Sequence, residues 1–201
     1  MKAALLAVLA AAALSGCALL GKSDPVVPRY FTLEYDGDAS AVRAPAGLQL
    51  RLGRVEGWSH LRERMVARDA ASEFSYSESQ RWTERPEIFL RRALARTLFE
   101  ERGVVEVLSG RAITLEVELI AFEEIQQPHQ VRMQAGLVLR DDRTSVLQET
   151  ITVERPVARG DGADRAPAVV DAFSQALRAG VTRIADRVVA RLAAQPSPAT
   201  N

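Results

Sequence analysis

The fold is decided by residues 113–140, which read ITLEVELIAFEEIQQPHQVRMQAGLVLR. Apolar residues alternate with polar residues from Ile113 to Leu119 and again from Val131 to Leu139. A period of two residues predicts strands with one buried and one wet face. The four residues 126–129 join the two strands as a hairpin loop. A turn at residues 141–144 leads into a third predicted strand over 146–155, so we expect an antiparallel meander.

Two helices flank the meander in the sequence. The first has an apolar stripe at Leu90, Leu94 and Leu98, with Thr83 predicted as its N-cap and Gly103 as the residue that ends it. The second covers residues 167–194, with apolar residues at helical spacing throughout. A glycine within a helix costs about 1 kcal/mol relative to alanine. We therefore predict a close backbone contact at Gly180.

The residues before the first helix predict further strands. Residues 30–35 and 48–52 are rich in strand formers, and residues 65–68 and 73–76 are two shorter candidates. The element order predicts an α+β fold, a two-layer sandwich in which two helices pack on one face of a mostly antiparallel or mixed sheet. We expect one domain over residues 30–194 and a disordered tail over 195–201.

The beginning of the sequence predicts a lipid anchor. Lys2 and an apolar run precede Leu14-Ser15-Gly16-Cys17, which resembles a bacterial lipobox. Residues 1–16 then form a signal peptide, and Cys17 carries a diacylglycerol on its thiol and an acyl chain on its amine. The alternative is an ordinary signal peptide followed by an incidental cysteine. Residues 17–29 form a tether, and the 13 steps from Cys17 to Tyr30 span at most roughly 45 Å.

Composition and motifs give no indication of catalysis. The chain has 26 Lys and Arg and 26 Asp and Glu, whereas a nucleic-acid binder would show an excess of basic residues. Its two histidines, His60 and His129, have no neighbours at the spacing of metal ligands. Neither a nucleophile elbow nor a phosphate-binding glycine loop occurs. We expect a protein that is not an enzyme and has no metal or cofactor.

Two clusters of aromatic and basic residues are candidates for a partner interface, because Trp and Arg are enriched at protein interfaces. One lies within residues 58–64 and the other within residues 76–82. Packing in the core is the alternative reading for both Trp82 and Trp58. The candidate interface residues are Trp58, His60, Arg62, Arg64, Tyr76, Arg81 and Trp82.

Several segments in this order resemble the ABC-type transport auxiliary lipoprotein family, which includes the PqiC-like proteins. They are the lipobox, Tyr30-Phe31-Thr32-Leu33, His60-Leu61 with Met65-Val66-Ala67-Arg68, Phe74-Ser75-Tyr76-Ser77-Glu78, Arg81-Trp82-Thr83-Glu84, the hairpin with Phe122-Glu123, and the long final helix. The family usually has Pro-Asp-Tyr-Leu-Asp-Arg where this chain has residues 58–63, Trp-Ser-His-Leu-Arg-Glu.

The resemblance implies a non-catalytic partner of an ABC transporter that carries an MCE-domain protein and moves lipids across the periplasm. In Gram-negative lipoproteins generally, a residue such as Ala18 after the lipidated cysteine implies the outer membrane, here facing the periplasm. A homo-oligomer that encircles the end of an MCE tunnel is compatible with that role. Two other functions stay open: an envelope lipoprotein that regulates a cell-wall synthase or another structural envelope assembly, and a periplasmic hydrolase.

Overall fold

A computed structural model describes most of the chain. The predicted signal peptide, the predicted lipidation site Cys17, the first part of the predicted tether and the predicted tail lie outside the described residues. The described residues are 25–35, 37, 42–69, 73–142, 144–159 and 164–194.

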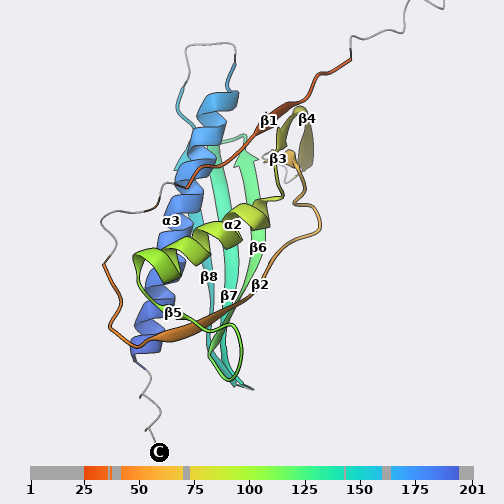
Figure 1. Ribbon diagram of the computed structural model, residues 1–201. Helices are drawn as coiled ribbons and strands as arrows, with labels where there is room; N and C mark the ends of the chain where they lie inside the picture. Colours follow the sequence, from red (N-terminus) through yellow and green to blue (C-terminus); the bar gives the residue numbers. More distant parts are fainter. Residues whose placement is uncertain are drawn as a thin grey trace, which may run out of the picture.

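The predicted meander forms one side of an eight-stranded mixed sheet, with β8 at its edge (Figure 1). It consists of β6 (Thr114–Ile125), β7 (Gln130–Asp141) and β8 (Thr144–Pro156), each antiparallel to the next. Residues 126–129 form the predicted turn between β6 and β7. The period-two alternation of apolar residues therefore predicted both the strands and their pairing.

The other edge of β6 pairs in parallel with two successive strands. They are β2 (Gln49–Gly57), on the first half of β6, and β3 (Arg64–Arg68), on its end. The remaining strands continue the sheet outward from these two: β4 (Phe74–Trp82) is antiparallel to β3, β1 (Arg29–Phe31) is parallel to β4, and β5 (Val105–Glu106) is parallel to β2.

The first predicted strand is shorter than expected. We predicted residues 30–35, but β1 ends at Phe31, and Leu33 is buried in the core. The chain leaves β4 at this point because it turns inward to bury that side chain. β5 has only two residues, too few for a period-two pattern to be recognised, and the sequence did not predict it.

The first helix begins later than predicted. Helix α2 (Pro86–Ala95) has Arg85 as its N-cap, without a side-chain hydrogen bond, so the prediction of Thr83 was wrong. The backbone N–H of Thr83 instead donates to the Phe31 carbonyl and extends the strand pairing. Arg85 is extended, as the residue before a proline usually is. The π-helix η1 (Arg96–Glu101) continues α2, and Gly103 follows with a φ of 72°.

The second helix agrees with the sequence to within one residue at each end. Helix α3 (Ala166–Ala193) runs along the sheet and packs on β7 and β8. At its start the Asp164 carboxylate accepts from the Ala166 backbone N–H at 3.1 Å and pairs with Arg29 of β1 at 2.8 Å. The hydrogen bond from Ala166 and the pairing with Arg29 lower the pKa of Asp164.

The predicted close contact at Gly180 exists, and its partner is a side chain. A Cβ atom at this position would lie 2.6 Å from the Sδ atom and 2.9 Å from the Cε atom of Met133 on β7. Glycine thus lets α3 approach the sheet over a buried methionine.

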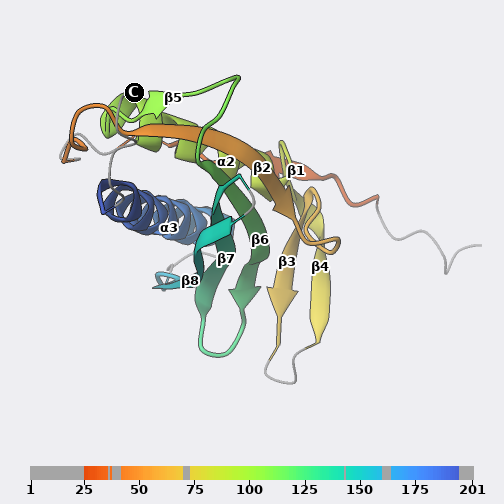
Figure 2. The ribbon, with the colours of Figure 1, turned by 90° about the horizontal axis from the view of Figure 1, so that it is seen from below.

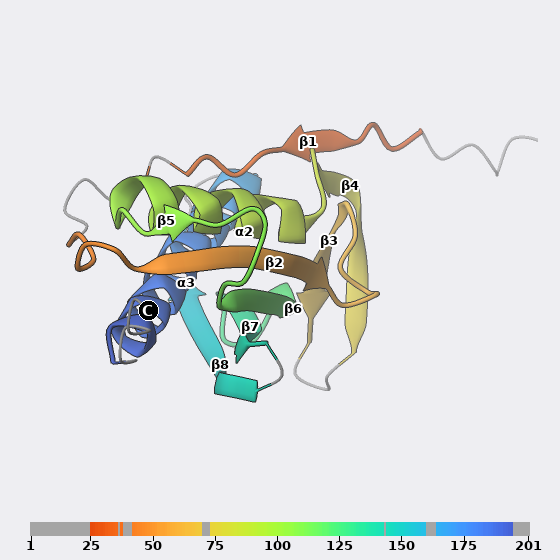
Figure 3. The same cartoon turned by 60° about the horizontal axis from the view of Figure 1, so that its bottom comes forward.

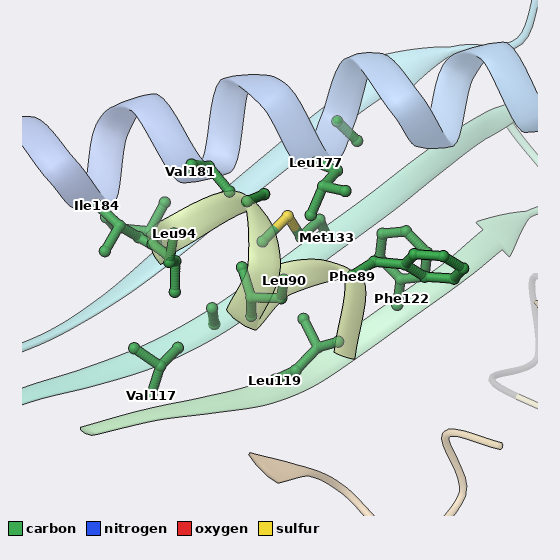
Figure 4. Close-up of a cluster of buried hydrophobic side chains, with 14 of the residues drawn as sticks. Phe89, Leu90, Leu94, Val117, Leu119, Phe122, Met133, Leu177, Val181 and Ile184 are labelled. Carbon is green, nitrogen blue, oxygen red and sulfur yellow. The ribbon is translucent and has the colours of Figure 1, made fainter. Parts of the chain in front are cut away.

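Both helices cover the same face of the sheet (Figure 2). The core between the layers contains Leu90 and Leu94 of α2, Val181 of α3, and Val117 and Leu119 of β6 (Figure 4). The opposite face is polar and carries cross-strand pairs such as Arg140–Glu116 and Gln134–Thr152. The fold is therefore α+β with two helices on one face, as predicted. None of the described helices has the length and apolar character needed to cross a bilayer.

Candidate functional site

A six-residue loop separates β2 from β3 along one edge of β6. β2 and β3 pair with the same edge of β6, and residues 58–63 leave the sheet between them. The Trp58 backbone N–H still donates to the Leu119 carbonyl at 3.0 Å, after which pairing resumes only at Glu123. The register of β6 against β7 also shifts, between Leu119 and Ala121. The loop, drawn in orange, passes beside β4 (Figure 3).

The loop brings two rings against an aromatic residue of β4. The ring centroids of Trp58 and His60 lie 6.2 Å apart in an edge-to-face arrangement, and those of His60 and Phe74 lie 4.8 Å apart. Tyr76 lies two residues after Phe74 in β4, and both residues pair with β3, so their side chains lie on the same face of the sheet. Trp58, Phe74 and Tyr76 are 46%, 38% and 40% exposed. We call Trp58, His60, Phe74 and Tyr76 the aromatic patch.

Charged side chains support this patch from the sheet. The Arg68 guanidinium lies 4.1 Å from the centroid of the Phe74 ring and donates two hydrogen bonds to Glu123, at 2.9 and 3.1 Å. Arg132 approaches Glu123 at 3.8 Å and pairs with Glu154 at 2.9 Å. These alternating charges cross β3, β6, β7 and β8. The carboxylate of Glu123 is fully buried, so this network fixes Arg68, and with it Phe74.

His60 is the titratable member of the patch. Burial lowers its pKa, the negative charge of Glu123 raises it, and the positive charge of Arg68 lowers it further. The net pKa lies below the ordinary value of 6.5, which favours a neutral imidazole at neutral pH. Its Nε2 atom is buried and makes no hydrogen bond to the described residues. The patch therefore presents apolar rings and one unused polar atom.

The structure separates the predicted interface residues into three groups. Trp58, His60 and Tyr76 lie in the aromatic patch. The arginines lie around it: Arg62 donates to the Ser59 carbonyl within the loop, Arg64 of β3 donates to the Ser77 carbonyl of β4, and Arg81 of β4 is partly buried opposite Arg64. Trp82, by contrast, is buried.

The prediction that Trp82 belongs to the interface was wrong, and the core alternative holds. Its side chain is 1% exposed and packs against Phe89, Phe122 and Phe173, with centroid distances of 6.1, 5.8 and 5.0 Å. The register between β3 and β4 shifts between Arg64 and Val66. This bulge in β4 reverses the side-chain alternation, so Tyr76 and Trp82 point to different environments although they are six residues apart.

Sequence reasoning missed Phe74, Arg68 and Glu123 as members of the site. Phe74 could have been found, because it precedes Tyr76 by two residues in a predicted strand. The pairing of Arg68 with Glu123 had no such signal, since 55 residues separate them.

Apart from the aromatic patch, a depression lies on the helical face. Its volume is about 450 Å³, and Leu33, Phe89 and Leu177 contribute apolar side chains to it. Arg92 lies at its rim and is paired with Glu84 at 2.9 Å. Within the described ranges, no three His, Cys, Asp or Glu residues are grouped so that they could hold a metal ion. The aromatic patch, for its part, offers exposed ring surface.

Comparison with known proteins places these features in a family. The model of a family described as the ABC-type transport auxiliary lipoprotein component matches residues 31–185. No curated protein matches the chain.

Solved structures share the fold at low sequence identity. Protein XCC0632 from Xanthomonas campestris is 18% identical, with a TM-score of 0.63 over 81% of this chain and 96% of that one. An uncharacterized protein is 17% identical, with a TM-score of 0.63 over 81% and 99% of the two chains. The hypothetical protein CT253 from Chlamydia trachomatis is 8% identical, with a TM-score of 0.52 over 74% and 99%.

Proposed function

The chain belongs to the family of ABC-type transport auxiliary lipoprotein components, and from this membership we propose a specific role for it in transport. It is an outer-membrane lipoprotein that faces the periplasm and serves an MCE-type ABC transport system, which moves lipids between the envelope membranes. It does so without catalysis, by docking the periplasmic end of the MCE-domain protein on the aromatic patch. Family membership supports the coarser part of this role, a transport-associated lipoprotein.

The single observation that carries the docking role is the exposure of the aromatic patch in a fixed arrangement. Trp58, Phe74 and Tyr76 expose large rings, and tryptophan and tyrosine are among the residues that dominate binding energy at interfaces. The contacts of His60 with Trp58 and Phe74, and of Arg68 with Phe74, hold the Trp58 and Phe74 rings in place. Side chains that are already ordered lose less entropy when a partner binds.

The position of the patch fits a membrane tether. β1 pairs with the end of β4, so the chain enters the domain beside the strand that carries Phe74 and Tyr76. With Cys17 lipidated, the tether to Tyr30 spans at most roughly 45 Å. A patch at this end of the domain stays close to the membrane, where the far end of a tunnel rooted in the inner membrane would arrive.

Site-specific photocrosslinking in intact cells tests the docking surface. We expect a photoreactive phenylalanine analogue at Trp58 or Phe74 to crosslink to the MCE-domain protein. The matched control is Leu108, which is 83% exposed but precedes the opposite end of β6. Equal crosslinking from Leu108 and the patch, or none from the patch, would refute the surface. Crosslinks to a cell-wall synthase would instead support the regulatory alternative.

Substitution of the proposed anchor tests the membrane attachment separately. The variant Cys17→Ser should lose incorporation of labelled fatty acid and leave the membrane fraction, because it lacks the thiol that forms the lipid linkage. A Cys17→Ser protein that stays membrane-bound and supports transport equally well would contradict the lipoprotein part of the proposal.

A further inference from the structure

Two long strands with a free edge, β8 and β4, differ in what covers that edge. The edge of β8 is covered by arginines of α3: Arg191 donates to the Val146 carbonyl at 2.8 Å, and Arg183 donates to the Thr152 carbonyl at 3.1 Å. Between them Arg187 forms a two-pronged pair with Glu149. Side chains that occupy edge carbonyls prevent another strand from pairing there.

Nothing in the described ranges covers the edge of β4 in this way over most of its length. In the described part of the chain, β1 pairs with residues 80–82 of β4 and with no earlier residue of that strand. Among the described residues, no strand pairs with the outer edge of β4 over residues 74–79. Residues 73–76 are all exposed.

The backbone groups of Phe74 and Tyr76 point toward this open edge. The Asp69 N–H donates to the Glu73 carbonyl, so the odd-numbered residues of this part of β4 bond to β3. The carbonyl of Arg68, opposite Phe74, accepts from Gln126 on the far side of β3. By the alternation of an antiparallel ladder, the N–H and C=O groups of Phe74 and Tyr76 face outward.

We propose that the transport partner adds an extended segment to this edge of β4 as a further strand. The inference rests on the proposed function and specifies how the MCE-domain protein is held. The edge already accepts one extended segment, β1, so the added strand continues an existing interface. Four outward backbone groups, two each from Phe74 and Tyr76, provide its hydrogen bonds.

The same placement defines the chemistry of the segment. Side chains of an added strand alternate, and every second one lies beside the Phe74 and Tyr76 rings. Both rings are large and partly exposed, so the segment carries apolar or aromatic residues at alternate positions. It has no proline where its N–H must reach the carbonyls of Phe74 and Tyr76.

Two substitutions of Tyr76 distinguish the contribution of backbone hydrogen bonds to partner binding from the contribution of the ring. Tyr76→Pro removes the ring and the outward N–H but leaves the hydrogen bonds to β3, because those are made by the neighbouring residues. Tyr76→Thr removes the ring alone and keeps a strand former. Binding is measured with the purified periplasmic part of the MCE-domain protein. We expect Tyr76→Pro to bind at least tenfold more weakly than Tyr76→Thr.

Amide hydrogen exchange on the wild-type chain provides a measurement that needs no variant to fold. The Phe74 and Tyr76 amides should exchange quickly alone and become protected when the MCE-domain protein is added. Equal binding of the two variants without new protection overturns strand addition and leaves docking intact. Absence of wild-type binding overturns docking and the strand addition with it. Protection that appears with rising concentration of this chain alone assigns the edge to a second copy and overturns the proposal.

Discussion

Arg68 and Glu123 join β3 to β6 through two hydrogen bonds of 2.9 and 3.1 Å, although 55 residues separate them in the chain. The Glu123 side chain is fully buried, and within the described residues its one other cationic neighbour is Arg132, at 3.8 Å. Arg68 also lies over the Phe74 ring. This ion pair thus links β3 to β6 beside the aromatic patch. It also orders the Phe74 ring, which we propose contacts the partner.

Removal of Arg68 should destabilise the protein strongly. Arg68→Met keeps the apolar stem over Phe74 but leaves a buried carboxylate with only the more distant Arg132. Breaking a buried pair from one side costs about 3 kcal/mol, and the remaining arginine reduces this to about 2 kcal/mol. Urea unfolding measures the loss.

The exposed pair between Arg187 and Glu149 is the matched control. It has the same two-pronged geometry, but Arg187 is largely in solvent. Arg187→Met should therefore change the unfolding free energy much less than Arg68→Met does. A loss of equal size in the two variants would show that burial of Glu123 does not govern the effect.

His60 should make the protein less stable in acid. Its pKa is lowered in the folded state, chiefly by burial, so between that value and 6.5 the unfolded chain binds more protons. Stability consequently rises with pH through this window and is lost as the pH falls. The groups that act on His60 are Glu123, which raises its pKa, and Arg68, which lowers it.

The variant His60→Phe keeps a ring between Trp58 and Phe74 and removes the titration. Unfolding free energies measured from pH 8 to pH 5 should fall less steeply for His60→Phe than for the wild type. His129→Gln, which retains His60 and replaces an exposed histidine in the turn between β6 and β7, is the control variant. Parallel profiles for His60→Phe and the wild type would contradict the buried, neutral imidazole.

Substitution of Gly180 by alanine should be tolerated only if the Met133 side chain is shortened. Alanine improves helix propensity by about 1 kcal/mol, but its Cβ would lie 2.6 Å from the Met133 Sδ atom. Overpacking of this kind costs about 2 kcal/mol, so Gly180→Ala should destabilise the protein by about 1 kcal/mol. In a Met133→Ala background the same substitution should be stabilising. Denaturant unfolding of the four proteins of this cycle gives the coupling, and additive effects would refute the contact.

Much of the fold was predictable because its elements carry long periodic patterns. The alternation over residues 113–140 predicted β6 and β7, and helical spacing predicted α3 to within one residue. Short elements lack such patterns, so β1 was predicted to be longer than it is and β5 was not predicted. At the start of α2 a tertiary hydrogen bond from Thr83 to β1 replaced the predicted cap.

The candidate site was predictable only in part, for a related reason. Trp58, His60 and Tyr76 were found by residue type, since exposed aromatic residues near arginines are typical of interfaces. Their convergence on Phe74 depends on the loop between β2 and β3, and the support from Arg68 depends on parallel pairing with β6. Neither relationship is local in sequence. The open edge of β4 likewise becomes visible only once the strand order is known.

The two tryptophans should give opposite results in stability and binding measurements. Trp82→Ala removes a buried ring that contacts Phe122 and Phe173, and should cost about 4 kcal/mol of unfolding free energy. Trp58→Ala truncates a half-exposed ring in a loop and should cost about 0.5 kcal/mol. Trp58→Ala should instead weaken binding to the purified periplasmic part of the MCE-domain protein about 30-fold, as loss of a central interface tryptophan does.

Unfolding in urea and binding to the immobilised MCE-domain protein, measured on the same preparations, check both tryptophan substitutions. Leu108→Ala is the control for loss of an exposed apolar side chain away from the patch, and it should change neither quantity. If Trp58→Ala bound as tightly as Leu108→Ala, the exposed ring would have no part in docking. The contact between the Trp58 and His60 rings would then serve the loop alone, and the docking surface would have to lie elsewhere on the domain.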